Sequence, residues 1–135
     1  MAVAPLVGIV GYRRSRRNFL GMQARMVTLR DGLLRVVDKD DVESERVTLA
    51  GAAVELRRGM VQVDDGDNAF FLFGYGATNK VPSELVELIS RQEAEIALAP
   101  GQDKFNVGEA FAASRVLYDL LLQAGARELQ GSAST

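Results

Sequence analysis

The sequence predicts an α+β protein in which a seven-stranded antiparallel β-barrel or sandwich is closed by a helix and followed by an additional C-terminal helix. Along residues 6–75, short apolar runs alternate with turn signals, a pattern typical of a small barrel or sandwich. From Pro82 onward the apolar residues recur at helical spacing instead. A length of 135 residues with 47% hydrophobic residues is sufficient for one domain with a buried core.

The predicted strands are short runs rich in Val, Leu, Ile and aromatic residues, which favour a pleated surface. They cover residues 6–12, 23–29, 33–37, 46–49, 53–56, 60–63 and 70–75. The third and fourth runs are separated by an acidic, polar connection at 39–45, and Gly51 separates the fourth from the fifth. Arg58–Gly59 and Asp64–Asn68 (DDGDN) carry turn residues between the later runs, so both are expected to form hairpin turns.

Asp31–Gly32 is the strongest local signal in the chain. It lies between two apolar runs, and a two-residue hairpin turn needs backbone angles that Asp and Gly tolerate. In the preceding arm, residues 23–29 alternate in character with a period of two. That alternation directs one set of side chains toward a core and leaves Arg25 near an edge or mouth.

Two helices are predicted after the strands. Leu85, Leu88, Ile89 and Ile96 recur at helical spacing after Pro82, which predicts a helix over 82–97. The capping-box residues Asn106 and Glu109 predict a second helix over 107–124, and Gly125 is suited to end it. We therefore expect a barrel with its closing helix (1–97), a C-terminal helical extension packed on the same domain (98–130) and a flexible tail (131–135).

The second helix carries an apolar stripe that is too extensive to face water. Its residues are Val107, Ala110, Phe111, Leu117, Tyr118, Leu121 and Ala124. The stripe must cover the barrel, meet its own copy in a dimer, or bind a partner. The short connection at 100–105 favours packing on the same domain, because short links usually join neighbouring elements. A monomer is therefore favoured, with a dimer through helix 107–124 as the alternative.

The composition argues against catalysis. The chain has no His and no Cys, so it lacks the commonest general base, the usual nucleophile pairs and the usual zinc ligands. We expect no enzyme activity, no cofactor and no metal. The absence of Cys fits a reducing, cytoplasmic location, and no apolar run reaches the roughly 18 residues that indicate a membrane span.

Positive charge is concentrated at the start of the chain. The first 30 residues contain six Arg and no acidic residue, although the whole chain has a net charge of −2. Guanidinium groups on a loop between two strands can form forked, charge-assisted bonds to phosphate oxygens. The predicted anion-binding residues are Arg13, Arg14, Arg16, Arg17 and Arg25. Phe19 and Leu20 are expected to contact a membrane or a partner, or to belong to the core of the second strand. Basic and aromatic residues do not interleave elsewhere, so nucleic acid is not expected as a partner.

Seven strands followed by a helix is the order of a pleckstrin-homology domain, and several segments agree with it. Residues 25–34 (RMVTLRDGLL) resemble the family's second and third strands, and 47–55 resemble the stretch that follows. Phe71–Leu72–Phe73 and residues 84–89 resemble its last strand and closing helix. The resemblance covers about residues 5–92 and not the C-terminal third. Leu88 stands where the family's helix usually has Trp, and Gln23 occupies one of the positions that are basic in phosphoinositide-binding members.

The resemblance implies a non-catalytic binding or adaptor module. Such a module would recognise phosphoinositide or other acidic lipid headgroups through the loop between its first two strands, as a peripheral protein at a membrane. The alternative that the resemblance leaves open is a protein-interaction or scaffold module without a lipid ligand.

Overall fold

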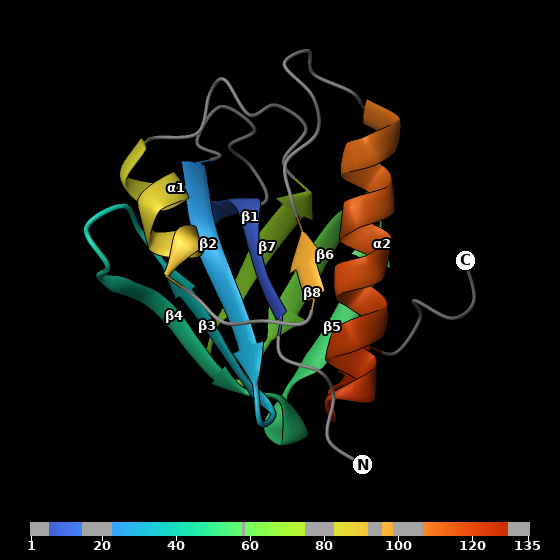
Figure 1. Cartoon of the computed structure of the whole chain (residues 1–135). Helices are drawn as coiled ribbons and strands as arrows, with labels where there is room; N and C mark the ends of the chain where they lie inside the picture. The colour runs from blue at the N-terminus through green and yellow to red at the C-terminus, as the bar shows by residue number, and fades with distance from the viewer. Residues whose placement is uncertain are drawn as a thin grey trace.

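β-Strands make up much of the chain that the computed structural model describes, namely residues 6–14, 23–57, 59–74, 83–91, 96–98 and 107–129. In chain order the elements are β1 (Leu6–Arg13), β2 (Gln23–Arg30), β3 (Leu33–Val37), β4 (Glu43–Thr48), the 3-10 turn η2 (Leu49–Gly51), β5 (Ala53–Arg57), β6 (Met60–Asp64), β7 (Ala69–Gly74), α1 (Ser83–Ser90), β8 (Ile96–Leu98), α2 (Val107–Gln123) and β9 (Arg127–Glu128). Figure 1 shows α1 beside β1 and β2, and α2 alongside β5, β6 and β7.

The strands form one open, mostly antiparallel sheet. Eight of them follow the order β4-β3-β2-β1-β7-β6-β5-β9, and β8 pairs with β1 outside this row. Among the strand pairs that the structure describes, β1–β8 and β5–β9 are parallel and the others are antiparallel. Within the described residues the row ends at β4 and β9 and does not close on itself, so the prediction of a closed barrel is wrong. Apolar side chains of α2 belong to the same buried cluster as Val47 of β4 and Val54 of β5.

The hairpin between β2 and β3 has the predicted two-residue turn. Arg30 pairs with Leu33, and the intervening Asp31 and Gly32 have φ angles of 54° and 76°. Both angles lie in the left-handed region, as a turn that matches the twist of the flanking strands requires. The carbonyl of Gly32 also accepts a hydrogen bond of 2.9 Å from the Leu49 N–H, which ties this turn to η2.

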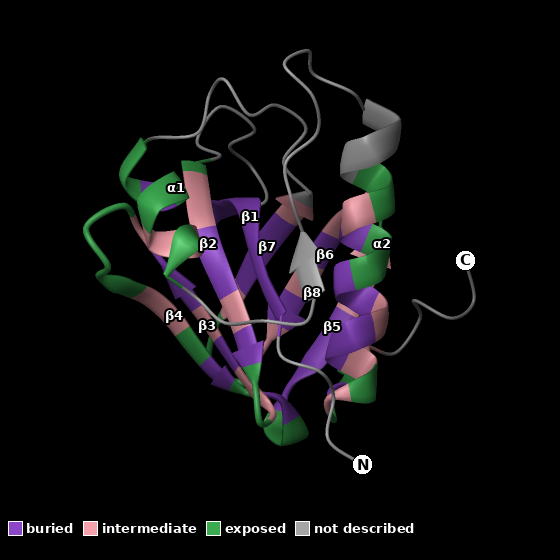
Figure 2. Cartoon of the chain, viewed as in Figure 1, coloured by how far each residue is buried: buried purple, intermediate pink, exposed green. Residues whose placement is uncertain are grey.

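The two faces of the sheet are covered by different helices. Along β1, Val10 and Tyr12 belong to the larger buried cluster that α2 covers, whereas Val7 and Ile9 belong to a smaller cluster with Leu85 of α1. Alternate residues of a strand point to opposite faces, so α2 and α1 lie on opposite sides of the sheet. We call these sides the α2 face and the α1 face. Figure 2 shows buried residues along the central strands and exposed ones on α1 and the β3–β4 turn.

α2 supplies the main core. Leu117, Tyr118 and Leu121 of the predicted stripe are buried, as is Leu120, whereas Phe111 is 44% exposed. The helix ends in a Schellman motif, in which the Ala126 N–H donates to the Leu121 carbonyl and the Gly125 N–H to that of Leu122. Gly125 has a φ of 121°, so its predicted role at the helix end is confirmed.

The helix predicted over 82–97 is wrong in length and in role. α1 ends at Ser90, and Ile96–Leu98 form β8 instead. The reason lies in β1, because β7 pairs only with Val10–Arg13 and leaves the edge of Leu6–Gly8 open. β8 occupies that edge in parallel pairing. α1 covers the smaller cluster, so it is not the helix that packs on the main core.

β4 contains a bulge just before Glu45 that determines which face Glu43 reaches. Val36 of β3 stands opposite Glu45, but the next residue, Val37, stands opposite Glu43. Ser44 is therefore the extra residue. Paired residues share a face, so Glu45 reaches the α2 face with Val36, and Glu43 reaches the α1 face with Val37. β4 also begins at Glu43 rather than at residue 46 as predicted.

Asp64–Asn68 forms a hairpin turn between β6 and β7, as predicted. The Asp65 N–H donates to the Asn68 carbonyl, and the Asp65 carboxylate accepts from the N–H groups of Asp67 and Asn68. These bonds, led by the one from Asn68, hold the pKa of Asp65 below its ordinary value. The Asp65 carboxylate therefore stabilises this turn by accepting hydrogen bonds from its backbone.

Candidate functional site

Three of the five predicted anion-binding residues lie where β1 ends and β2 begins. Arg13 closes β1, Arg14 follows it, and Arg25 lies near the start of β2. The antiparallel register places Tyr12 opposite Gln23 and Val10 opposite Arg25, so Arg14 and Arg25 are at the same end of the sheet. Arg16, Arg17, Phe19 and Leu20 lie outside the described residues.

Arg13 points away from the other two arginines. Its side chain is on the α1 face, because Tyr12 before it points to the α2 face. The residue is only 4% exposed. Its Nη2 donates to the Met60 sulfur at 3.3 Å, and its guanidinium carbon lies 5.5 Å from the centre of the Phe71 ring. Arg13 thus packs between neighbouring strands and does not present its charge to solvent.

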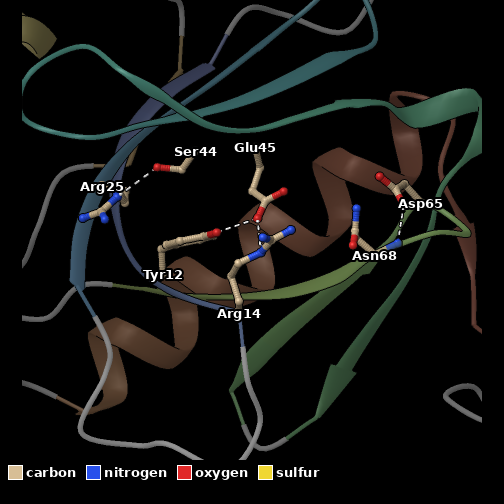
Figure 3. Close-up of polar contacts among 7 residues, drawn as sticks. All are labelled: Tyr12, Arg14, Arg25, Ser44, Glu45, Asp65 and Asn68. Atoms are coloured by element: carbon tan, nitrogen blue, oxygen red, sulfur yellow. Dashed lines mark hydrogen bonds and ion pairs between the residues drawn. The ribbon is translucent and has the colours of Figure 1, made fainter.

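Glu45 brings Tyr12 and Arg14 together. Its Oε2 accepts a hydrogen bond of 2.5 Å from the Tyr12 hydroxyl and lies 3.1 Å from Arg14 Nε. The Glu45 side chain is only 9% exposed, whereas that of Arg14 is 61% exposed. Figure 3 shows the phenol and the guanidinium converging on one carboxylate oxygen. Regular pairing with β3 makes this contact available, because it places Glu45 on the α2 face with Val36 and Val47.

Arg25 is held over the same tyrosine from the other side. Its Nε donates to the Ser44 hydroxyl at 3.2 Å, and its Nη1 and Nη2 donate to the Ala24 carbonyl and the Gln23 amide oxygen. The guanidinium carbon is 5.5 Å from the centre of the Tyr12 ring, within the range of a cation–π contact. These contacts fix the Arg25 side chain on the α2 face, at the end of the sheet where β2 begins.

The Tyr12 hydroxyl keeps its proton more strongly than an ordinary tyrosine does. Burial raises its pKa well above the ordinary value, and the hydrogen bond to Glu45 and the charge of that carboxylate raise it further. The positive charges of Arg14 and Arg25 act in the opposite direction but do not outweigh these causes. At neutral pH the hydroxyl is thus a hydrogen-bond donor.

The arrangement offers hydrogen-bond donors and positive charge to an anion. Arg14 and the Tyr12 hydroxyl contact the Glu45 carboxylate, and Arg25 lies against the Tyr12 ring, so two guanidinium groups and one carboxylate leave the cluster with one net positive charge. Among the described residues, no group of His, Cys, Asp and Glu could hold a metal ion. The chemistry on offer is charge-assisted hydrogen bonding to an oxyanion.

Tyr12, Ser44 and Glu45 were not predicted as site residues. The alternation of β1 and β2 could have placed Tyr12 on the same face as Arg25, because both positions face the predicted core. Glu45 stands two residues before Val47 of the predicted strand, but the sequence from 39 to 45 resembles a polar connection, so the predicted strand does not reach it. Ser44 had no signal, since the bulge has no distinctive residue. Their positions depend on the pairing of β4 with β3.

Comparisons with known proteins add no relative to this description. Neither a protein-family model, nor a curated protein, nor a solved structure matches the chain. None of the described helices is both long and apolar enough to cross a membrane. The function must therefore be inferred from the site itself.

Proposed function

We propose that the chain is a non-catalytic module that binds an anionic lipid headgroup at the end of the sheet where Arg14 and Arg25 flank Tyr12. The observation that carries this proposal is that Arg14 shares the Glu45 carboxylate with the Tyr12 hydroxyl, while the Arg25 guanidinium lies against the ring of the same tyrosine. A module of this kind is peripheral at the cytoplasmic side of a membrane, and it functions as a monomer.

Charge near the site supports membrane binding. Arg16 and Arg17 follow Arg14 closely in the sequence. Together with Arg14 and Arg25 they make four arginines in or near the segment that joins β1 to β2. Each basic residue near an anionic membrane contributes about 1 kcal/mol of binding. A total of about 3–4 kcal/mol from these residues is enough for reversible docking. Arg13 is left out of this set because its charge is buried.

The finer description of the fold is part of the same proposal. Seven consecutive antiparallel strands, followed by a helix, support a pleckstrin-homology-like arrangement. The open sheet, the added β8 and β9, and the position of α2 on the main core are departures from the predicted form of that fold. The proposal that the module binds anions depends on the arginines and not on the family.

Vesicle co-sedimentation tests the proposed function. The double variant Arg14→Gln/Arg25→Gln should lose binding to phosphatidylcholine vesicles that contain a phosphoinositide or phosphatidylserine. The matched control is Arg57→Gln/Arg91→Gln, which removes the same charge from exposed arginines that pair with Glu55 and Glu87. This control should bind as the wild type does, and raising the salt concentration should weaken wild-type binding. Equal binding by the two double variants would contradict the proposal.

A protein partner is the second candidate, and one observation favours it. α2 buries Leu117, Tyr118 and Leu121 of its stripe but leaves Phe111 44% exposed, and Val116 outside the stripe is 43% exposed. Exposed large apolar side chains are common at interaction surfaces. A wild-type protein that binds no anionic vesicle at any salt concentration would favour this interaction or scaffold role instead.

A further inference from the structure

The anion-binding donors of the site are already occupied within the chain. Glu45 Oε2 accepts from the Tyr12 hydroxyl and faces Arg14 Nε. Two donors that belong to β1 and to the residue after it thus converge on one oxygen atom. A ligand oxyanion can take both donors only by replacing that oxygen.

The carboxylate is well placed to compete with a ligand. The Glu45 side chain is 9% exposed, so the protein shields it from water. Its backbone belongs to β4, which fixes its position. The Arg14 side chain is 61% exposed, so a ligand can approach the guanidinium from solvent. The pair is therefore asymmetric, with the acid fixed inside and the base able to reorient outward.

We infer that Glu45 is an internal competitor for the headgroup, which sets the affinity of the site by occupying Tyr12 and Arg14 in the free protein. This inference rests on the proposed function. A binding headgroup must displace Glu45 or share Arg14 with it. Either change weakens the contacts of Glu45 with Tyr12 and Arg14, and the free energy of those contacts is subtracted from the affinity. A single negative charge only replaces the one already present, whereas a phosphomonoester carries a charge of about −1.5 to −2 at neutral pH. The resting protein is thus suited to phosphomonoester groups.

Glu45→Gln tests this inference with a nearly isosteric change. The amide oxygen can still accept from Tyr12, but the charge opposite Arg14 is lost. We expect about three- to tenfold tighter binding to phosphatidylcholine vesicles containing phosphatidic acid, because an ion pair with a solvent-exposed arginine contributes up to about a factor of five and the repulsion between Glu45 and the ligand is removed as well. Titration with vesicles, followed by co-sedimentation, measures the change.

Glu43→Gln is the matched control. It removes the same charge from the same strand, but Glu43 pairs with Arg35 and Arg46 on the α1 face. A gain caused by net charge alone would be equal in the two variants. A gain confined to Glu45→Gln supports competition within the site, and inorganic phosphate added in solution should reduce binding if a free phosphate group reaches the same donors. Inorganic phosphate without effect would assign the site to the lipid-borne group.

Failure of this inference is distinguishable from failure of the proposed function. If Arg14→Gln/Arg25→Gln abolishes binding while Glu45→Gln binds as the wild type or more weakly, Glu45 is an anchor for Arg14 and the competition is disproved. If neither the wild type nor Glu45→Gln binds any anionic vesicle, both ideas fail. Binding by Glu45→Gln alone would show that Glu45 blocks the donors, but it would contradict the proposed function of the wild-type protein. Thermal melting of each variant confirms that it is folded.

Discussion

Tyr12 combines three contacts that each depend on its position near the end of β1. Its ring packs 6.0 Å from that of Phe70 and lies under Arg25, while its hydroxyl donates to Glu45. These contacts connect the buried core with the polar site. Tyr12 therefore contacts both the core and the polar site, and the protonation of its hydroxyl should affect the free energy of unfolding.

The pKa of Tyr12 predicts a loss of stability at alkaline pH. The folded protein holds the phenol proton more tightly than the unfolded chain, whose tyrosines titrate near 10. This contribution is complete below pH 10 and is lost as the pH rises above it. Tyr12→Phe should cost about 1–2 kcal/mol at neutral pH through loss of the hydrogen bond to a charged acceptor. Its free energy of unfolding should then fall less steeply than that of the wild type above pH 10, as urea titrations at several pH values would measure. Parallel curves would show that Tyr12 ionises as freely in the folded state as in the unfolded one.

At the scale of elements, local signals were predictive and pairing between distant strands was not. The Asp31–Gly32 turn and the Gly125 helix end follow from backbone angles that few residues tolerate, and both are present. Ile96 instead looked helical because its spacing from Leu85 and Leu88 fits a helix. Its actual place depends on the open edge of β1, which no local pattern reveals. The same holds for Ser44, whose place beside Arg25 depends on the β4 bulge.

The β5–β6 turn provides a prediction about contact between elements. Gly59 has a φ of 76°, and a Cβ atom there would collide with the ring of Phe111 from α2. Gly59→Ala should therefore cost about 2–3 kcal/mol, of which roughly 1 kcal/mol comes from the left-handed backbone. In a Phe111→Ala background the same change should cost only about 1 kcal/mol, because the collision is gone. Chemical denaturation of the four proteins in this cycle measures the coupling. Equal costs in both backgrounds would mean that Phe111 does not rest on the turn.

At the scale of the whole molecule, the sheet separates two buried clusters, one on each face. The α1 face is covered by a short helix with one fully buried leucine, whereas the α2 face holds the larger cluster and ends at the proposed binding site. Tyr12 belongs to that larger cluster and also donates to Glu45. The site is therefore supported by the part of the core that α2 completes, and loss of α2 packing should disturb both stability and binding.

Leu121 tests whether α2 belongs to the core of a single chain. The residue is 0% exposed and lies in the cluster with Leu34, Leu49 and Leu72. Leu121→Asp places a carboxylate in that cluster and should destabilise the protein by about 3–5 kcal/mol. The melting temperature should fall sharply and by the same amount at every protein concentration, because the contacts lie within one chain. Val116→Asp, on an exposed position of the same helix, should leave the melting temperature nearly unchanged. A Leu121→Asp protein that keeps its melting temperature but shows half the apparent mass would instead place α2 at the seam of a dimer.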